Sequence, residues 1–308
     1  MVRFGTGGWR AIIGEEFTRE NIRKLSLALC LKMEDEGTSG EGIVIGYDRR
    51  FLSKEAVIWA SQVFGSRGIR VMFVNRSSPT PLIMFYVMKH GLSYGMMVTA
   101  SHNPAIYNGI KVFTRGGRDA DEAQTADIER YLAKAEALYE PQDEEAGQMP
   151  PPSYLELVKK GMVTEINPLN EYLDNILSVI NVDAIRERDL RIAIDPMYGV
   201  SLTALSTILS VARCTIETIN AQHDTLFGGK MPAPTEGTLR SLQNYVLDRY
   251  CDIGIATDGD ADRLGVIDDR GQYLHANDIL VMLYYYLLKY KGWRGPAVRN
   301  LATTHVLD

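Results

Sequence analysis

The chain contains the apolar run Cys251-Asp252-Ile253-Gly254-Ile255-Ala256 and, after Thr257, the acidic loop Asp258-Gly259-Asp260-Ala261-Asp262-Arg263. The apolar run is typical of a buried strand, so the acids are expected at the carboxyl end of that strand, where open α/β sheets bind ligands. Carboxylates this close repel one another, because at about 5 Å and an effective dielectric constant of about 20 each pair costs roughly 3 kcal/mol. A hard divalent cation with oxygen ligands, Mg²⁺ by preference, would relieve that repulsion. The acidic loop therefore predicts an α/β fold with a metal site at a sheet edge.

Two known acidic motifs fit this spacing poorly. An EF-hand calcium loop needs Gly at its sixth position and Glu at its twelfth, where this chain has Arg263 and Asp269. A phosphatase of the Asp-x-Asp-x-Thr type needs a hydroxyl residue where Asp262 stands. A solvated acidic turn is the remaining alternative, although turns seldom gather three acids beside a Gly and an Arg.

Length and composition indicate an ordinary globular chain. Its 308 residues predict about two domains, and hydrophobic and charged residues make up 45% and 23% of it. The formal net charge of -6 disfavours nucleic acid or an anionic membrane as the main partner. An anionic substrate would therefore need a local cluster of basic residues.

The cysteines and the apolar segments indicate a soluble, cytoplasmic protein. Cys30, Cys214 and Cys251 lie in apolar runs, which favours buried thiols in a reducing compartment. The start of the chain leads directly into a polar, glycine-rich stretch, so no signal peptide is expected. The most apolar helix-like run, residues 279–290, is too short to span a bilayer.

Strand-like and helix-like patterns alternate along the chain, which predicts two consecutive layered α/β domains with mixed sheets flanked by helices. In the first domain, helices are expected at residues 18–36, 53–67, 79–90 and 121–139, and strands at 43–47, 69–74, 94–99 and 109–114. In the second, strands are expected at 191–195, 215–219, 251–256 and 264–267, and helices at 201–210, 238–250 and 278–289. A linker is expected at 140–152, since it is rich in Pro, Gly and acids. The expected domains are residues 1–150 and 151–295, with 296–308 as the first strand and turn of a third.

Three further segments contain reactive or basic side chains. Thr99-Ala100-Ser101-His102-Asn103-Pro104 follows a strand, where Ser101 could act as a nucleophile or phosphoryl carrier, although a plain Asn-Pro turn fits equally well. Asn108-Gly109-Ile110-Lys111 turns Lys111 onto a strand near the same edge, where a solvated lysine is the ordinary alternative. The glycine-rich stretch Arg3-Phe4-Gly5-Thr6-Gly7-Gly8-Trp9-Arg10 could approach a phosphate, but it matches neither a Walker loop nor Gly-x-Gly-x-x-Gly.

Together, these segments resemble the α-D-phosphohexomutase family, which includes phosphoglucomutases, phosphomannomutases and phosphoglucosamine mutases. The matching segments are residues 4–10, residues 99–104 with 108–111, and residues 258–263, and they occur in the family's order. The second and third are highly specific. The opening Gly-Thr-Gly-Gly-Trp-Arg is most similar to bacterial phosphoglucomutases and phosphomannomutases.

The resemblance implies a phosphoenzyme that interconverts hexose 1-phosphate and hexose 6-phosphate, with glucose or mannose as the sugar. Ser101 would give its phosphoryl group to a hexose phosphate and take the other one back from the hexose 1,6-bisphosphate. Mg²⁺ would be held by the phosphate on Ser101 and by the carboxylates of Asp258, Asp260 and Asp262. The other implied roles are charge neutralisation by Arg10 and Arg263, acid/base catalysis by Lys111, and orientation of the phosphoserine or its acceptor by His102.

The chain also departs from the family. A complete member has four domains, with a Gly-Glu-x-Ser-Gly-His loop in the third and an Arg/Ser/Gly/Thr phosphate-binding loop in the fourth, and neither motif occurs here. We therefore expect a fragment that lacks the third and fourth domains and has little or no mutase turnover. Three alternatives remain: a phosphoglucosamine mutase, a metal-dependent phosphatase, and a non-catalytic metal-binding module.

Overall fold

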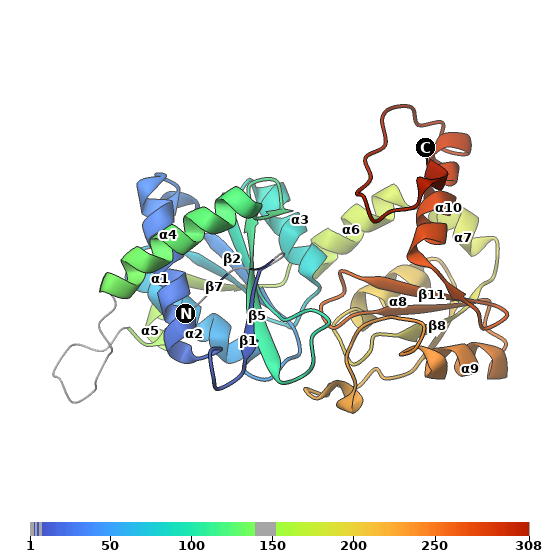
Figure 1. Ribbon diagram of the computed structural model, residues 1–308, viewed down its shortest axis with the longest axis horizontal. Coiled ribbons are helices and arrows are strands. Elements are labelled where there is room, and N and C mark those ends of the chain that lie inside the picture. The colour runs from blue at the N-terminus through green and yellow to red at the C-terminus, as the bar shows by residue number, and fades with distance from the viewer. Residues whose placement is uncertain (1–2, 4, 6–7, 139–151, 308) are drawn as a thin grey trace.

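The computed structural model describes residues 3, 5, 8–138 and 152–307. Two α/β units follow one another along the chain, and each is a mixed sheet flanked by helices, which confirms the predicted fold class (Figure 1). The expected linker at 140–152, except for its last residue, lies outside the described residues, as do Phe4, Thr6 and Gly7 of the glycine-rich stretch. Among the described helices, none has both the length and the hydropathy needed to cross a bilayer.

The first unit is built on a sheet with the strand order β1-β5-β4-β2-β3-β7, and β6 adds to it beside β5. Strands β4, β2, β3 and β7 run parallel, whereas β1, β5 and β6 pair antiparallel. The strands are β1 (Trp9–Ile12), β2 (Ile43–Tyr47), β3 (Val71–Val74), β4 (Tyr94–Val98), β5 (Tyr107–Thr114), β6 (Arg118–Asp119) and β7 (Val163–Ile166). The helices are α1 (Arg19–Asp35), α2 (Ser53–Ser66), α3 (Thr80–His90), α4 (Glu122–Leu138) and α5 (Tyr154–Lys159).

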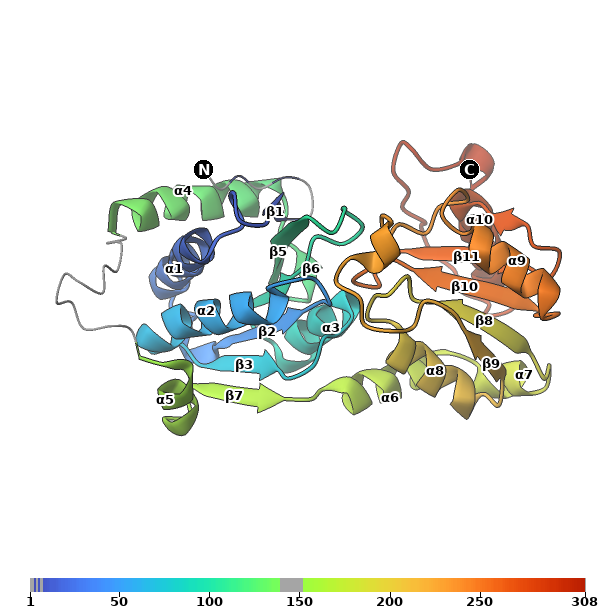
Figure 2. The same ribbon diagram turned by 90° about the horizontal axis from the view of Figure 1, so that it is seen from below.

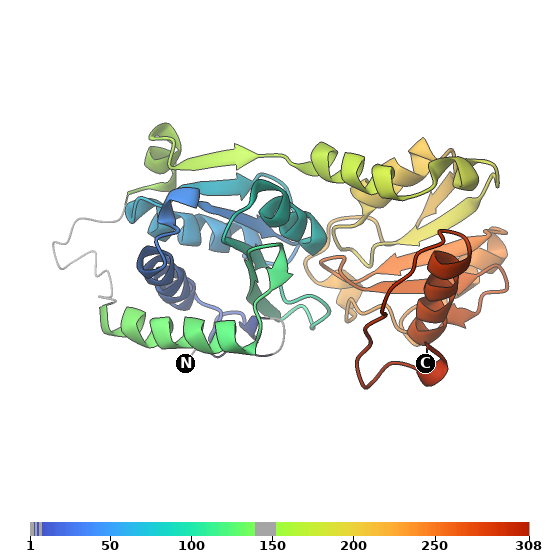
Figure 3. The same ribbon diagram turned by 90° about the horizontal axis from the view of Figure 1, so that it is seen from above.

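Side chains alternate along β2, so the first sheet has an apolar core on each face. Ile43 and Ile45 point into the core that α1 and α2 share, whereas Val44 points to the opposite face, where α3 packs. Helix α4 packs on α1 (Figure 3). Burial of each such aliphatic side chain contributes roughly 1.5–3 kcal/mol. This double-sided packing holds the carboxyl ends of the parallel strands in place.

The first sheet extends past residue 150, where the sequence patterns placed the domain boundary. Strand β7 pairs in parallel with β3, and α5 packs against α2, so both elements belong to the first unit. Neither was predicted from the sequence. Strand β7 is only four residues long and exposes Thr164 and Glu165. Its sequence therefore has too few apolar residues to be told apart from a loop.

The second unit has a sheet with the strand order β12-β11-β10-β8-β9. Strands β10, β8 and β9 run parallel, and β11 and β12 are antiparallel. The strands are β8 (Arg191–Asp195), β9 (Thr215–Thr218), β10 (Ile253–Thr257), β11 (Leu264–Asp268) and β12 (Tyr273–Leu274). The helices are α6 (Leu169–Val179), α7 (Val182–Arg186), α8 (Leu202–Val211), α9 (Arg240–Asp248) and α10 (Ala276–Lys289).

The second unit repeats the packing logic of the first. From α9, Leu242 and Val246 pack on one face of the sheet, while α8 places Leu209 on the other. The end of the chain differs from expectation, because residues 297–307 form no strand, although they contain a turn at residues 300–303 and a 3-10 turn at His305–Leu307. In the part of the chain that the structure describes, no neighbouring strand offers this segment the hydrogen bonds that a strand needs.

The carboxyl ends of the parallel strands of the two sheets face each other (Figure 2). Strand β4 leads into the loop with Ser101, and β10 leads into the acidic loop. A Cβ on Gly259 would lie 2.9 Å from the carbonyl oxygen of Ser101. Glycine at this position therefore allows the two loops to come into contact.

Candidate active site

Ser101 lies at the centre of the contact between the two units. It is 1% exposed, and its backbone has a φ of 51°, which is unusual for a residue with a Cβ. Such a conformation costs roughly 1–3 kcal/mol and persists only where surrounding contacts hold it. The hydroxyl of Ser101 donates a hydrogen bond to Oδ2 of Asp258 at 2.7 Å, so the predicted nucleophile touches the predicted metal loop.

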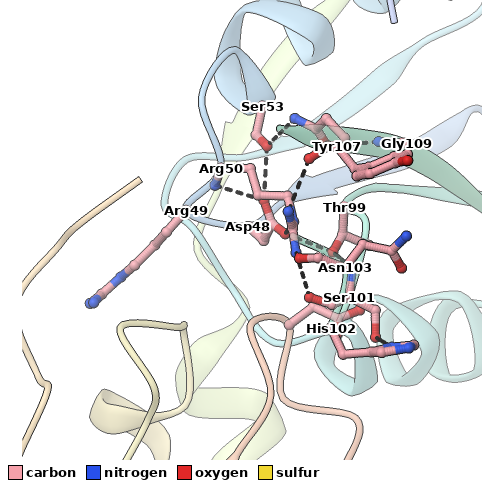
Figure 4. Close-up of polar contacts among 12 residues, drawn as sticks. Asp48, Arg49, Arg50, Ser53, Thr99, Ser101, His102, Asn103, Tyr107 and Gly109 are labelled. Atoms are coloured by element: carbon pink, nitrogen blue, oxygen red, sulfur yellow. Dashed lines mark hydrogen bonds and ion pairs between the residues drawn. The ribbon is translucent and has the colours of Figure 1, made fainter. Parts of the chain in front are cut away.

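A buried arginine, Arg50, binds the backbone of the loop that contains Ser101. The guanidinium of Arg50 donates to the carbonyl oxygens of Ser101 at 2.7 Å, Asn103 at 2.6 Å, and Pro104 and Tyr107 at 2.9 Å (Figure 4). It also stacks 4.9 Å from the ring centroid of Phe227 in the second unit. Four carbonyls on one guanidinium fix the shape of the loop, since the planar fork of arginine is rigid.

Asp48 completes this support. Its carboxylate lies 3.3 Å from Nε of Arg50 and accepts hydrogen bonds from the hydroxyls of Thr99 and Ser53 at 2.6 and 2.8 Å. Burial raises the pKa of Asp48, and the nearby Arg50 opposes that rise. Sequence reasoning assigned no role to these two residues. Their position directly after strand β2 was the available signal, because it is the same kind of strand end that holds Ser101.

The acidic loop brings its three carboxylates together. One oxygen from each of Asp258, Asp260 and Asp262 lies within 4.8 Å of the others. Oδ1 of Asp258 accepts from the backbone N–H groups of Asp262 and Arg263, both at 3.0 Å. Oδ1 of Asp260 is buried and has no hydrogen-bond partner among the described residues. Oxygen donors in this arrangement, one of them unpaired, fit a hard divalent cation.

The pKa values of the acidic loop are shifted because its carboxylates are buried close to one another. Burial, helped by the neighbouring carboxylates Asp260 and Asp262, raises the pKa of Asp258 to about 8. Burial also opposes ionisation of Asp260, but the ammonium of Lys111 outweighs it and holds the pKa of that carboxyl below its usual range. One carboxyl of the loop is therefore protonated near neutral pH unless further positive charge is present.

Lys111 reaches the acidic loop from β5. Its side chain is almost fully buried, and its ammonium donates to Oδ2 of Asp260 at 2.8 Å and to Oδ2 of Asp262. Burial lowers the pKa of Lys111, but the two carboxylates outweigh that effect and raise it. Gly8 packs directly against this part of β5. A Cβ on Gly8 would lie 2.6 Å from the carbonyl oxygen of Ile110 and 3.2 Å from Cα and Cγ of Lys111.

The remaining predicted residues surround the same point. Arg10 lies on β1 opposite Gly109 of β5, and its buried Nε has no hydrogen-bond partner within residues 8–138 and 152–307. His102 has Nδ1 at 3.5 Å from the hydroxyl of Ser101, and burial together with Arg263 and Arg10 lowers its pKa. Arg263 is half-exposed, with Nε 3.9 Å from Oδ2 of Asp258. The structure thus gathers every predicted site residue at one place.

Contacts that the sequence did not reveal also join the two units here. Arg49 donates to the carbonyl oxygens of Tyr198 and Ala221, both at 3.2 Å. Thr80, the first residue of α3, donates its hydroxyl to Oδ2 of Asp260 at 2.7 Å. The site is therefore formed jointly by both units.

Both units match models of known protein families. The family described as phosphoglucomutase/phosphomannomutase, α/β/α domain I, matches residues 1–138, and the corresponding domain II matches residues 170–271. The phosphoglucomutase/phosphomannomutase of Thermococcus kodakarensis is 29% identical over 99% of this chain and 63% of its own length. The phosphoglucosamine/phosphogalactosamine mutase of Sulfurisphaera tokodaii is 31% identical over 87% of this chain and 55% of its own length.

A solved structure shows the same fold. The crystal structure of a protein assigned as a phosphomannomutase from Thermus thermophilus superimposes with a TM-score of 0.85 and 27% identity. The match covers 99% of this chain and 65% of that protein. The chain thus spans between 55% and 65% of the length of these three proteins.

Proposed function

We propose that this chain, which belongs to the α-D-phosphohexomutase family of phosphoglucomutases and phosphomannomutases, carries a phosphoryl group on Ser101 and exchanges it with hexose phosphates. In one direction the bond between Oγ of Ser101 and phosphorus breaks, a sugar hydroxyl takes the phosphoryl group, and the proton of that hydroxyl ends on Oγ of Ser101. In the other direction the second phosphoryl group of the resulting hexose 1,6-bisphosphate returns to Ser101. The net result of both directions is conversion of a hexose 1-phosphate into a hexose 6-phosphate, although we expect little turnover from this chain, which spans between 55% and 65% of the length of the relatives described above.

The contact between Ser101 and Asp258 is the observation that carries the proposal. The buried hydroxyl of Ser101 donates to one of three clustered carboxylates, so a phosphoryl group on it would lie beside the oxygen atoms that fit a divalent cation. A phosphoserine there would add a charge of about -1.5 to -2 and three acceptor oxygens. The cationic side chains of Lys111, Arg10 and Arg263 supply part of the charge that this group requires.

A divalent cation such as Mg²⁺ fits the oxygen atoms of the acidic loop. Asp258, Asp260 and Asp262 would hold it together with the phosphate on Ser101, and the unpaired Oδ1 of Asp260 is one free ligand atom within the described part of the chain. When bound, the ion neutralises negative charge beside the phosphoryl group. The chain's own donors then orient the phosphate.

The charge states of Lys111 and His102 at neutral pH follow from the directions in which their pKa values are shifted. Lys111 has a raised pKa because Asp260 and Asp262 hold its proton, so at neutral pH it is an ammonium that can donate a hydrogen bond to the phosphoryl group. We infer that it acts as a general acid or base once a divalent cation takes up the charge of these carboxylates. His102 has a lowered pKa, so its imidazole is neutral and can donate a hydrogen bond to the phosphoserine or accept one from the acceptor hydroxyl.

Incubation with glucose 1,6-bisphosphate and Mg²⁺ tests this function. We expect each protein molecule that gains a phosphoryl group to leave one molecule of glucose monophosphate, with little inorganic phosphate. Release of inorganic phosphate on every cycle would instead indicate a phosphatase, and no reaction would favour a non-catalytic metal-binding module. Repeating the incubation with mannose and glucosamine bisphosphates identifies the preferred sugar. These sugars are chosen because the two relatives are named as mutases of hexose phosphates and of hexosamine phosphates.

A further inference from the structure

Helix α3 of the first unit begins without a cap of its own. Its N-cap residue is Pro79, which has no side-chain oxygen, and Pro81 in its first turn has no N–H group. The first N–H groups of a helix need acceptors from outside the helix. The N–H of Thr80 finds one in the second unit, because it donates to the carbonyl oxygen of Asp260 at 2.8 Å. The acidic loop therefore caps α3.

The same threonine also holds the carboxylate of Asp260. Its hydroxyl donates to Oδ2 at 2.7 Å, and Lys111 donates to the same oxygen at 2.8 Å. Thr80 is 1% exposed and Asp260 is fully buried, so water does not compete for these bonds. Two donors on Oδ2 fix the rotation of the carboxylate and leave Oδ1 without a partner among the residues described. Hydrogen bonds of this kind orient metal ligands and tune metal affinity.

We propose that Thr80 is a positioning residue for the metal site: from the first unit, it sets the orientation in which Asp260 of the second unit offers Oδ1 to a divalent cation. This inference rests on the proposed metal site. Because the threonine and the aspartate belong to different units, metal affinity then depends on the docking of α3 against the acidic loop. A purely structural hydrogen bond would stabilise the contact but leave metal affinity unchanged.

Calorimetric titration with Mg²⁺ tests the proposal in the full 308-residue chain. Thr80→Val keeps the shape and the N–H of the residue and removes the hydroxyl, and we expect it to weaken Mg²⁺ binding by about tenfold. Thr80→Ser restores the hydroxyl and should bind nearly as the wild type does. Ser61→Ala is the matched control, since it removes a buried hydroxyl whose one hydrogen bond among the described residues lies within α2, to Val57.

The outcomes separate this inference from the proposed function. If Thr80→Val binds Mg²⁺ as tightly as the wild type, Thr80 does not position the ligand, although the metal site stands. If the wild type itself does not bind Mg²⁺, the metal site and this inference both fail. A weakening in Thr80→Val that Thr80→Ser reverses and Ser61→Ala does not share supports the inference.

A second measurement needs no variant and so does not depend on the folding of Thr80→Val. In the wild type, amide hydrogen exchange is followed by mass spectrometry with and without Mg²⁺. We expect Mg²⁺ to slow exchange in peptides from residues 80–84 together with those from 258–262. Slowing confined to residues 258–262 would show that the ion does not tighten the contact with α3, and would overturn the proposal.

Discussion

Ser101 combines a strained backbone, full burial and a hydrogen bond to a carboxylate of another unit, and the pair Asp48–Arg50 makes this combination stable. The arginine binds the carbonyls of the loop, and the aspartate binds both the arginine and Thr99. A buried ion pair of this type seldom makes a protein more stable than apolar side chains of the same size would. Loss of one partner is nevertheless costly, because the other charge is then buried without a counter-ion.

Arg50→Met should therefore lower the free energy of unfolding by about 3–5 kcal/mol, because Asp48 loses its buried counter-ion. Urea denaturation followed by circular dichroism measures this change. Arg70→Met serves as the control, since the side chain of Arg70 makes a single, exposed hydrogen bond in the described part of the chain, to Gly40. We expect this variant to change stability by less than about 0.5 kcal/mol. Equal effects of the two variants would mean that Arg50 does not support the loop.

The acidic loop should give the protein a specific pH dependence. Burial and like charges raise the pKa of Asp258 from 3.8 to about 8, so the native state holds a proton that the unfolded chain releases. The stability that this proton provides is complete below pH 3.8 and is lost as the pH rises toward 8.

In EDTA, denaturation midpoints of the wild type at successive pH values should therefore fall across this range relative to those of Asp258→Asn, which mimics the protonated carboxyl. Mg²⁺ should flatten the difference, because positive charge favours the carboxylate. Parallel curves for the two proteins in EDTA would contradict the raised pKa.

At the scale of single residues, the sequence indicated the side chains for which we propose chemistry, but not those that hold them in position. The three acids, Ser101 and Lys111 stand in segments with an unusual composition, so pattern and family resemblance both indicate them. Thr80 and Arg50 stand in ordinary segments, and their importance comes from partners far away in sequence. Thr80 meets Asp260 across 180 positions, and only the fold brings them together.

Strand β1 is the element that brings Arg10 to the site, and its pairing with β5 depends on Gly109. A Cβ on Gly109 would lie 2.1 Å from the carbonyl oxygen of Trp9, which no side-chain movement can relieve. Gly109→Ala should therefore separate the two strands and lower stability by about 1–3 kcal/mol, measured by thermal denaturation. Gly40→Ala, with nothing within 4 Å of the added carbon among the described residues, should be neutral, and an equally mild Gly109→Ala would refute the close approach.

Helix α10 has no buried residue although it is 14 residues long, whereas α7, which also buries none, has only five residues. None of its residues is buried against the described part of the chain, although Met282, Leu283 and Tyr285 are large, apolar and more than half exposed. Helices of this length gain most of their stability from packing. Amide hydrogens of α10 should therefore exchange much faster than those of α1, whose apolar face is buried, and hydrogen-exchange mass spectrometry compares the two directly. Equal protection would show that α10 is held by contacts other than those described.

The elements that the sequence did not reveal are mostly short. Predicted helices and inner strands were found within a few residues of their expected ranges, because burial on two faces imposes long apolar patterns. Strands β1, β6, β7 and β12 have two to four residues each, and they owe their strand conformation to a neighbour in the sheet. Pairing of this kind depends on distant residues, so local patterns do not show it.

At the scale of the whole molecule, the two units make one site because loops from both sheets meet edge to edge (Figure 2). Ser101, Lys111 and Thr80 come from the first unit, and each of them bonds to an aspartate of the second. The alternation of strands and helices predicted two such units, and the rule that ligands bind at the carboxyl ends of strands indicated the loops for which we propose chemistry. No local pattern in the sequence predicted how one unit docks on the other.

The central claim is that Ser101 carries a phosphoryl group beside the three carboxylates of the acidic loop. Tandem mass spectrometry after incubation with glucose 1,6-bisphosphate and Mg²⁺ locates that group within the chain. We predict a single phosphorylated residue, Ser101, with no phosphorylation of Ser101→Ala and full phosphorylation of the Ser61→Ala control. A phosphate on another residue, or an unmodified Ser101 in a protein that binds Mg²⁺, would contradict the account.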